Sequence, residues 1–442
     1  MHGRGLDRRT ALKVIGTAAA ATAATGSFAP DTGLADVGAD IGGDWQAVRA
    51  LFDLVPDRIH MSAMLLAAHP APVRAAIERH RRELDADPVA YLERNNGPMA
   101  AAAREAAGGY LGVHPSHIAL TDSTTAGVGL IYNGLVLRPG QEVLATEEDY
   151  FVTIESLRTA TERSGAGFRT IPLYENAAEA SVDRIVSGIV AAIRPQTRLL
   201  ALTWVHSSTG LKMPIAAIAA ALGDINAERA EEDRVLLGVD AVHGFGVERD
   251  DFAALGCDFY MAGCHKWLFG PRGTGIVAIS GEGLAATRPL IPSFSDDGVF
   301  TAWLQGLDAP PGSNDGERLS PGGFKAFEHR WALPEAFEMH RRIGRERIAE
   351  RTHQLAGMLK EGLAGTEGVV VRTPMPAELS AGIVSFDVAG TDPDAVVSSL
   401  RQAGVVASVA PYATRHVRLT PSIRNDEADV DGALAAVRGL VA

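Results

Sequence analysis

Two ionisable residues at the ends of apolar runs are the strongest chemical signal in this 442-residue chain. Lys266 ends the segment Asp258-Phe-Tyr-Met-Ala-Gly-Cys-His-Lys266, and Asp240 ends the upstream run Val235-Leu-Leu-Gly-Val-Asp240. A partly desolvated lysine has a lowered pKa, so its amine is neutral and can attack a carbonyl group. An aspartate that faces a heterocyclic nitrogen keeps this nitrogen protonated, and the ring then becomes an electron sink.

Together these residues indicate pyridoxal phosphate (PLP) as the cofactor, with Lys266 as its Schiff-base anchor and Asp240 beside its ring nitrogen. Taken singly, Lys266 also fits a surface lysine after a strand, and Asp240 fits a turn residue at a strand end. The pair, with His265 before the lysine and the turn Gly270-Pro-Arg-Gly-Thr-Gly275 after it, favours the functional interpretation. The two cysteines, Cys257 and Cys264, form no metal-ligand cluster, so we expect no metal site and no disulfide framework.

This arrangement resembles the class V aminotransferase family of fold type I PLP enzymes, and within it the branch similar to isopenicillin N epimerase. The resemblance covers nearly all of the chain after the first few tens of residues. It implies an α/β fold, with a mostly parallel seven-stranded sheet in a large domain and a smaller α+β C-terminal domain. It also implies a homodimer, because the family builds each active site at a subunit boundary.

The hydrophobic pattern predicts a similar sheet. Apolar runs bounded by turn residues alternate with helical patterns such as 181–193 and 214–222. Continuous apolar strands separated by helices are typical of a parallel sheet that is covered on both faces. The expected strands are 117–120, 142–146, 168–173, 198–205, 234–242, 258–264 and 275–280.

Four segments are expected along the chain: a signal peptide (1–35), an N-terminal segment that joins the small domain (36–70), the large PLP-binding domain (71–325) and the small C-terminal domain (326–442). The stretch 281–323 is rich in Pro, Gly, Ser and Asp, so we expect an irregular binding segment or mobile cover, with a disordered insertion as the alternative. In the small domain we expect a charged helix over 341–363 and strands at 368–372, 382–387, 405–409 and 415–420.

A hydroxyl-rich turn between a strand and a helix is the candidate phosphate site. The segment Ile118-Ala-Leu-Thr-Asp-Ser-Thr124-Thr125 would place hydroxyls and backbone amides at a helix N-terminus, which favours anions. Such clusters also cap helices without any ligand. The family resemblance implies that Thr124 and the amide of Thr125 hold the cofactor phosphate, and that His265 also reaches it.

The resemblance assigns three further positions to the cofactor. Tyr150 stands where the family has the side chain that stacks on the ring, often a histidine, although it also fits a loop aromatic packed on the next helix. Ser207, or its neighbour His206, matches the family segment that approaches the phenolic oxygen of the PLP ring and the substrate. His243 falls where the family has a polar group that binds the same oxygen, and its alternative is a structural histidine.

Arg418 matches the family arginine that clasps the substrate carboxylate, and a planar guanidinium binds a carboxylate in bidentate fashion. Arg424 and Arg330 fit structural ion pairs better. The family often has a Gly-Thr pair near Arg330 that contacts the phosphate of the neighbouring subunit. The chain lacks this pair there, and the residues 320–324 are the possible replacement.

The N-terminus resembles a twin-arginine export signal, because Arg8-Arg9 precede the uncharged run 14–29. The alternatives are a membrane anchor or a disordered tail, but this run is rich in Ala, Thr and Gly and falls short of the roughly 20 strongly apolar residues that span a bilayer. The twin-arginine route is understood to carry folded proteins, which suits a cofactor loaded before export. We therefore expect a periplasmic or secreted protein that meets the twin-arginine machinery and has no stable membrane anchor.

The formal net charge of −13 argues against nucleic acid as a partner. A non-catalytic PLP-binding sensor would add a DNA-binding module, for which the chain has no room. A dinucleotide-dependent oxidoreductase would need Gly-x-Gly-x-x-Gly after the first strand, and this motif is absent there. Cysteine desulfurases that act through a persulfide need a cysteine in the small domain, and none follows Cys264.

In the expected reaction the substrate amine first displaces Lys266 by transaldimination, and the freed lysine can then remove or return a proton at the α-carbon. Transamination, epimerisation and elimination all branch from this step, and the sequence leaves the choice open. Export favours the amino-acid moiety of a peptide, siderophore or other secondary metabolite as the substrate, and one similar enzyme is the periplasmic PLP enzyme that tailors a pyoverdine. We expect chemistry of the transamination or deamination type, with epimerisation or C–S cleavage as the alternative.

Overall fold

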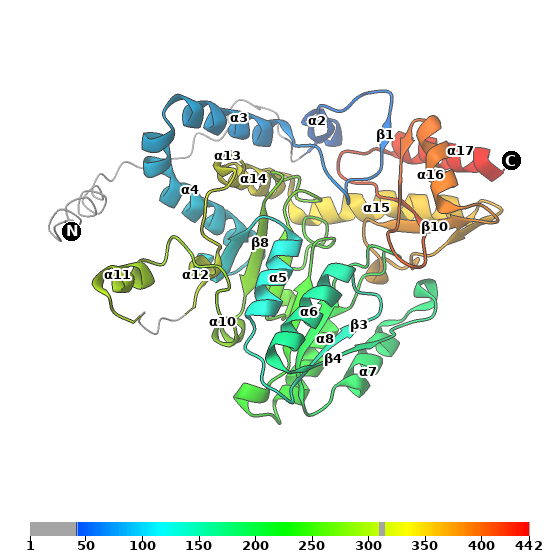
Figure 1. Cartoon of the computed structure of the whole chain (residues 1–442). Helices are drawn as coiled ribbons and strands as arrows, with labels where there is room; N and C mark the ends of the chain where they lie inside the picture. The colour runs from blue at the N-terminus through cyan, green and yellow to red at the C-terminus, as the bar shows by residue number, and fades with distance from the viewer. Residues whose placement is uncertain (1–40, 42, 309–313, 442) are drawn as a thin grey trace, which may run out of the picture.

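The computed structural model describes residues 41, 43–308 and 314–441 (Figure 1). Its central sheet has seven strands in the order β2-β8-β7-β6-β5-β3-β4. All neighbours pair in parallel except β8, which is antiparallel to β2 and to β7. The expected mostly parallel seven-stranded sheet is therefore confirmed. Its strands are β2 (Ile118–Thr121), β3 (Glu142–Thr146), β4 (Gly167–Ile171), β5 (Thr197–Thr203), β6 (Leu236–Asp240), β7 (Phe259–Gly263) and β8 (Gly275–Ile279).

Helices cover both faces of this sheet because successive strand residues point to opposite sides. Leu200 and Leu202 of β5 belong to one buried cluster, with α4, α7 and α8, whereas Leu199 and Ala201 belong to another, with α5 and α6. Both faces of the strand are thus apolar and buried, as the continuous hydrophobic runs predicted. These helices are α4 (Pro88–Leu111), α5 (Thr124–Gly134), α6 (Phe151–Ser164), α7 (Val182–Ala192) and α8 (Ile215–Asn226).

A second, antiparallel sheet forms the small C-terminal domain and has the strand order β12-β13-β10-β9. Its own buried cluster joins the sheet to the helices α15, α16 and α17. The N-terminal strand β1 (Ile59–His60) pairs in parallel with β11 (Val405–Val406), so this N-terminal segment lies beside the small domain. The elements are α15 (Arg345–Ala364), β9 (Val369–Val371), β10 (Val384–Val388), α16 (Pro393–Gln402), β12 (Ser408–Val409), β13 (Val417–Leu419) and α17 (Glu427–Val441).

Two local expectations were wrong. The described residues of the stretch 281–323 contain three helices, because Ser280, Asp296 and Asp315 each cap the helix that follows with a side-chain oxygen. The expected continuous helix over 341–363 is divided at Gly344, which has a φ of +94° and a backbone conformation outside the helical region. The helices around these points are α10 (Gly281–Ala286), α11 (Asp297–Gln305), α12 (Gly316–Leu319), α13 (Phe327–Trp331) and α14 (Leu333–Ile343).

The remaining α-helices of the described part are α2 (Trp45–Ala50), α3 (Ala71–Ala86) and the short α9 (Phe252–Leu255). Figure 1 shows α3, α13 and α14 together at the end of the molecule opposite β3 and β4. Within the described ranges, none of the helices is long and apolar enough to cross a bilayer. The predicted export signal and its Arg8-Arg9 pair lie outside the described residues.

Candidate active site

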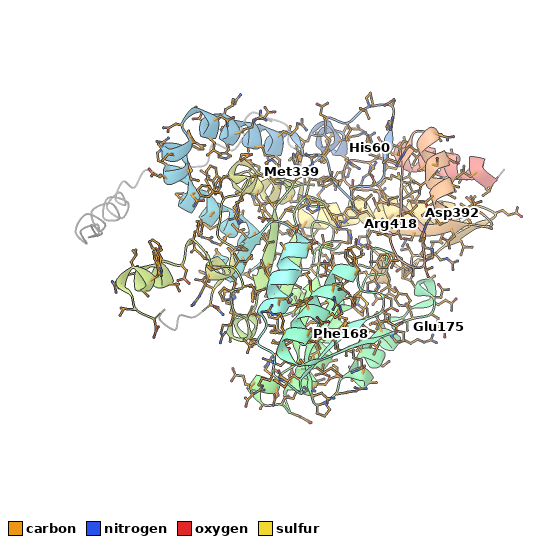
Figure 2. All side chains as sticks on the ribbon, viewed as in Figure 1. His60, Phe168, Glu175, Met339, Asp392 and Arg418 are labelled. Carbon is orange, nitrogen blue, oxygen red and sulfur yellow. The ribbon has the colours of Figure 1, made fainter. Side chains whose placement is uncertain are left out.

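The predicted site residues follow the carboxyl ends of neighbouring strands. Asp240 ends β6, Lys266 follows β7, Ser207 follows β5 and Tyr150 follows β3. Parallel strands place their carboxyl ends at one edge of the sheet, where open α/β folds bind their ligands. The side chain of Arg418, on β13, reaches this edge from the small domain, at the boundary between the two domains (Figure 2).

Lys266 and Asp240 have the electrostatic properties that the sequence analysis required. Burial lowers the pKa of the Lys266 amine to about 8, and the nearby Asp240 carboxylate opposes this shift. Asp240 is 5% exposed, and burial raises its pKa to about 6. Its Oδ1 accepts a hydrogen bond of 3.1 Å from the Val242 amide, which leaves its other oxygen for a protonated ring nitrogen.

His243 lies next to the lysine and has a fixed orientation. Its Nε2 is 3.5 Å from Lys266 Nζ, and its Nδ1 accepts a hydrogen bond of 3.2 Å from the indole Nε1 of Trp267. An indole N–H can only donate, so Nδ1 carries no proton. Burial lowers the pKa of His243 well below its usual range, so the ring is neutral and its single proton sits on Nε2, facing Lys266.

The N-terminus of α5 offers a set of donors for a phosphate group. Ser123 caps the helix, and its Oγ accepts from the Ala126 amide at 3.1 Å. The amides of Thr124 and Thr125, in the first turn, have no helical partner and can bind an anion. The Thr124 Oγ1 accepts from the Gly263 amide at 2.8 Å, and its own hydroxyl hydrogen can still be donated.

Gly263 allows His265 to approach this cradle. A Cβ atom at Gly263 would lie 3.0 Å from Thr124 Oγ1 and 3.0 Å from Cε1 of the His265 ring. The absence of a side chain therefore lets the histidine and the threonine converge at one point above β7. The three predicted phosphate ligands, Thr124, Thr125 and His265, are thus brought together.

Ser207 has a partner that the sequence analysis missed. Its Oγ lies 2.8 Å from the phenolic oxygen of Tyr412, which comes from the loop between β12 and β13 of the small domain. The Tyr412 ring also lies against the Tyr150 ring, with centroids 5.7 Å apart and an interplanar angle of 54°. No local motif marks Tyr412, and only its position six residues before Arg418 could have suggested it.

Arg418 is a buried cation that forms no ion pair with any described residue. It is 1% exposed, and burial lowers its pKa to about 10. Its Nε donates to Ser408 Oγ, its Nη1 to the Ser207 carbonyl at 2.7 Å and its Nη2 to the Val409 carbonyl at 2.8 Å. A guanidinium has five N–H groups, so two remain to bind a carboxylate that would also balance the charge.

The other residues considered from sequence lie elsewhere or bind other groups. His206 points to Tyr174, whose hydroxyl lies 2.9 Å from its Nδ1. Arg424 donates to the His60 carbonyl, which is a structural contact rather than an ion pair. Arg330 lies 3.8 Å from Asp122, close in sequence to the α5 cradle, and the proposed phosphate contact from a neighbouring subunit stays a prediction.

The site residues fit PLP. The cofactor requires an amine that can be neutral, a carboxylate for its ring nitrogen and donors for its phosphate, and Lys266, Asp240 and the Thr124 cradle supply these groups. Tyr150 stays the predicted stacking residue. Among the described residues no group of three or more His, Cys, Asp or Glu side chains could hold a metal ion.

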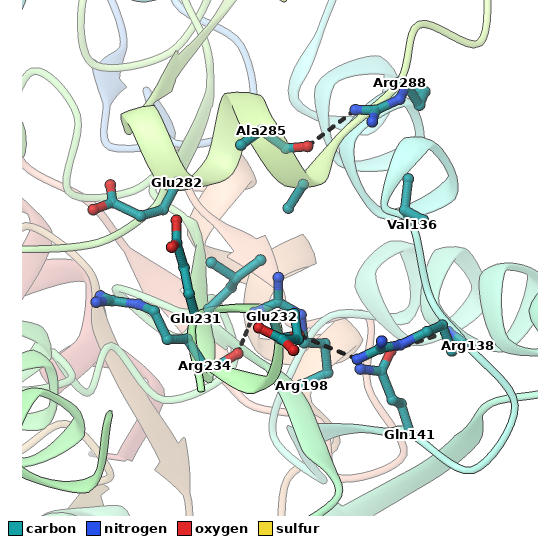
Figure 3. A pocket seen from close by; sticks show the side chains of 12 residues that line it. Val136, Arg138, Gln141, Arg198, Glu231, Glu232, Arg234, Glu282, Ala285 and Arg288 are labelled. Atoms are coloured by element: carbon teal, nitrogen blue, oxygen red, sulfur yellow. Dashed lines mark hydrogen bonds between the residues drawn. The ribbon is translucent and has the colours of Figure 1, made fainter. Parts of the chain in front are cut away.

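Two cavities lie away from this site. One, of about 360 Å³, lies at the opposite edge of the sheet and is lined by arginines and glutamates such as Arg138, Arg198 and Glu232 (Figure 3). The other, of about 590 Å³, lies between α8 and α15. Neither contains a predicted site residue.

Both cysteines are buried, at Cys257 and Cys264. Burial raises the pKa of each thiol, to about 12 for Cys264. Neither thiol is suited to nucleophilic catalysis, because the reactive species is the thiolate. The prediction that the small domain lacks the cysteine of a persulfide mechanism rests on the sequence alone, in which no cysteine follows Cys264.

Comparison with known proteins gives a consistent family and fold. Residues 92–424 match the family described as aminotransferase class-V. The chain is 30% identical over 354 residues to the isopenicillin N epimerase of Amycolatopsis lactamdurans, covering 79% of this chain and 86% of the relative. It is 28% identical over 360 residues to the isopenicillin N epimerase of Streptomyces clavuligerus, with the same coverage.

Solved structures share the fold at lower identity. A variant of C-DES with glycine covalently linked to its PLP cofactor has a TM-score of 0.78 and 22% identity, over 88% of this chain and 98% of that one. The cysteine desulfurase of Thermococcus onnurineus has a TM-score of 0.76 and 20% identity, over 90% and 98% of the two chains. The fold is therefore that of the fold type I PLP enzymes.

Proposed function

Because the chain belongs to the class V aminotransferase family of PLP-dependent enzymes, we propose that it acts on the amino-acid moiety of a peptide, siderophore or other secondary metabolite. The observation that carries this proposal is the Lys266 amine, whose pKa burial lowers to about 8, which lies 3.5 Å from His243 Nε2 and which interacts electrostatically with Asp240. Such an amine can remove a proton from carbon at neutral pH.

When bound, PLP withdraws electrons from the α-carbon of the substrate and weakens the bond to its proton. Asp240 would hold the proton on the ring nitrogen. The Thr124 and Thr125 donors, with His265, would fix the phosphate of PLP. His243 would donate from Nε2 toward the phenolic oxygen of the PLP ring. Arg418 would bind the substrate carboxylate through its two free N–H groups, which orients the α-carbon proton toward Lys266.

Epimerisation is the outcome that we favour among the branches. The two relatives at about 30% identity are both isopenicillin N epimerases and align over most of their length. An epimerase returns a proton to the face of the α-carbon opposite to the one that lost it. Transamination or deamination, the first expectation from sequence, and C–S cleavage are the competing outcomes.

One experiment separates these outcomes. The purified holoenzyme is incubated in deuterated water with isopenicillin N, and separately with a panel of free L-amino acids, before mass spectrometry and chiral chromatography. We expect deuterium at the α-carbon, an inverted product and no loss of the amine. Formation of a keto acid would identify transamination, and loss of a side-chain substituent would identify elimination. A Lys266→Ala variant must lose all of these activities, and Lys212→Arg, which retains a cation near Glu248 away from the site, serves as its control.

Export and dimerisation are further parts of the proposal. The Arg8-Arg9 pair and the uncharged run 14–29 after it support export by the twin-arginine route to the periplasm or the medium. Cell fractionation of the wild type and of an Arg8→Lys/Arg9→Lys variant tests this, and equal export of both would contradict it. Light scattering of the holoenzyme tests the homodimer, for which a mass of one chain would be the contrary result.

A further inference from the structure

The small-domain loop between β12 and β13 delivers a phenol to the site. Tyr412 lies in this loop, and its oxygen is 2.8 Å from Ser207 Oγ, which belongs to the large domain. Its ring packs against Tyr150 at the start of α6. Ser207 follows β5 and Tyr150 follows β3, so these two contacts fix the Tyr412 phenol beside the ends of both strands.

Lys266 and Tyr412 reach the site from different sides. In the sheet order β7-β6-β5-β3, Lys266 follows β7, Asp240 ends β6 and Ser207 follows β5. The lysine therefore enters on one side of Asp240, and Tyr412, held by Ser207 and Tyr150, enters on the other. A ligand placed above Asp240 has an amine on one flank and a phenol on the opposite flank.

Asp240 and Arg418 are charged neighbours of both groups. Each of the two influences the pKa of Lys266 and that of Tyr412. If the substrate carboxylate binds Arg418, the α-carbon of the substrate lies in the space between the Lys266 amine and the Tyr412 phenol. Burial raises the pKa of Tyr412, so the phenol is protonated and can donate at neutral pH.

We propose that Tyr412 is the second proton donor of the α-carbon reaction and acts on the face opposite to Lys266. This inference rests on the proposed function and adds a residue to it. The α C–H bond would break with transfer of its proton to Lys266 Nζ, and PLP, when bound, would supply the electron sink for the remaining pair. The O–H bond of Tyr412 then breaks as a new C–H bond forms on the other face, which leaves a phenolate beside the Arg418 guanidinium. Proton exchange with water removes the extra proton from Lys266 and returns one to Tyr412.

The test is a Tyr412→Phe holoenzyme in deuterated water, with isopenicillin N and free L-amino acids as probes. The variant should still exchange the α-hydrogen for deuterium through Lys266, but with retention of configuration. We expect its inversion rate to fall by roughly 100-fold or more, within the usual range for loss of a general acid. Continued exchange and an unchanged cofactor absorbance band show that the variant is folded. Tyr91→Phe is the matched control, since it removes another phenol with a hydrogen bond, at His80 on the α3–α4 side.

Several outcomes would overturn this role. Inversion by Tyr412→Phe at the wild-type rate would contradict it. Loss of inversion in Tyr150→Phe, but not in Tyr412→Phe, would instead assign the proton donor to Tyr150. Loss of exchange together with inversion in Tyr412→Phe would contradict the division between two faces. A wild type that exchanges without inversion overturns the role of Tyr412 but leaves α-carbon chemistry intact, whereas a wild type without exchange on any probe overturns the proposed function as well.

Discussion

The indole Nε1 of Trp267 donates a hydrogen bond of 3.2 Å to Nδ1 of His243 and thereby places the imidazole proton on Nε2. This proton faces Lys266 Nζ at 3.5 Å. A neutral Lys266 amine can accept a hydrogen bond from this N–H group, whereas an ammonium group cannot. The His243 proton therefore favours the neutral form of Lys266. Trp267 is therefore a positioning residue, because it acts on the lysine through the histidine.

Replacement of Trp267 by Phe should raise the pKa of Lys266. Without the indole donor, the His243 proton can move to Nδ1, and Nε2 can then accept from the ammonium form. A hydrogen bond contributes about 1 kcal/mol, and one pKa unit corresponds to about 1.4 kcal/mol, so we expect a rise of roughly half a unit to one unit. The measurement is the pH dependence of cofactor reconstitution, with the ¹⁵N shifts of His243 as a direct report on its tautomer.

Trp331→Phe is the matched control for this variant. Trp331 is also buried, but its indole nitrogen has no hydrogen-bond partner among the described residues, so the substitution removes no such bond. Equal pH profiles for Trp267→Phe and the wild type would contradict the positioning role.

Reconstitution of the apoenzyme with PLP should follow the titration of Lys266. Only the neutral amine reacts, so the rate should rise with pH and level off above a midpoint of about 8, well below the value of an ordinary lysine. Asp240 favours the charged form of the lysine, so Asp240→Asn should move the midpoint to lower pH. Stopped-flow absorbance measures both profiles, and a midpoint above 10 in the wild type would show that burial does not depress the pKa.

Arg418→Gln should weaken substrate binding more than cofactor binding. Loss of one partner from a buried charge pair costs about 2–5 kcal/mol, so kcat/KM should fall by at least roughly 30-fold. Arg415→Gln, in the loop just before β13, removes an exposed arginine that pairs with Asp392 and Asp394, and it should leave kcat/KM unchanged. Steady-state kinetics compares the two variants on the probe that the wild type converts in deuterated water, and the cofactor absorbance band reports whether each variant still binds PLP. An equal fall in kcat/KM for both variants would contradict the role of Arg418 in binding the substrate carboxylate.

Gly263→Ala should lower the affinity for the cofactor. The new Cβ atom would lie 3.0 Å from both Thr124 Oγ1 and the His265 ring, so the phosphate cradle must widen. A loss of one phosphate hydrogen bond to a charged group, at about 1.5–3 kcal/mol, corresponds to a roughly 10- to 100-fold higher Kd for PLP. Fluorescence titration of the apoenzyme provides the Kd. Gly109→Ala on α4, where nothing lies within 4 Å of the new atom, is the control, and an unchanged Kd in Gly263→Ala would show that the cradle tolerates the methyl group.

The sequence by itself determined the strands and the residues at their ends. Continuous apolar runs leave little choice other than a buried parallel sheet, and residues directly after such strands must meet at one edge. Lys266 and Asp240 could therefore be placed from local patterns, because they follow or end the neighbouring strands β6 and β7, whereas His243 was assigned through the family resemblance.

Only the tertiary structure decided which side chains complete the site. Tyr412 meets Ser207 across 205 residues of sequence, and Arg418 reaches the same serine from the small domain. Such contacts depend on how two domains pack, which no spacing along the chain encodes. Trp267 meets His243, and His206 turns to Tyr174, within the large domain; these contacts depend on side-chain directions after strands, which the local sequence does not encode.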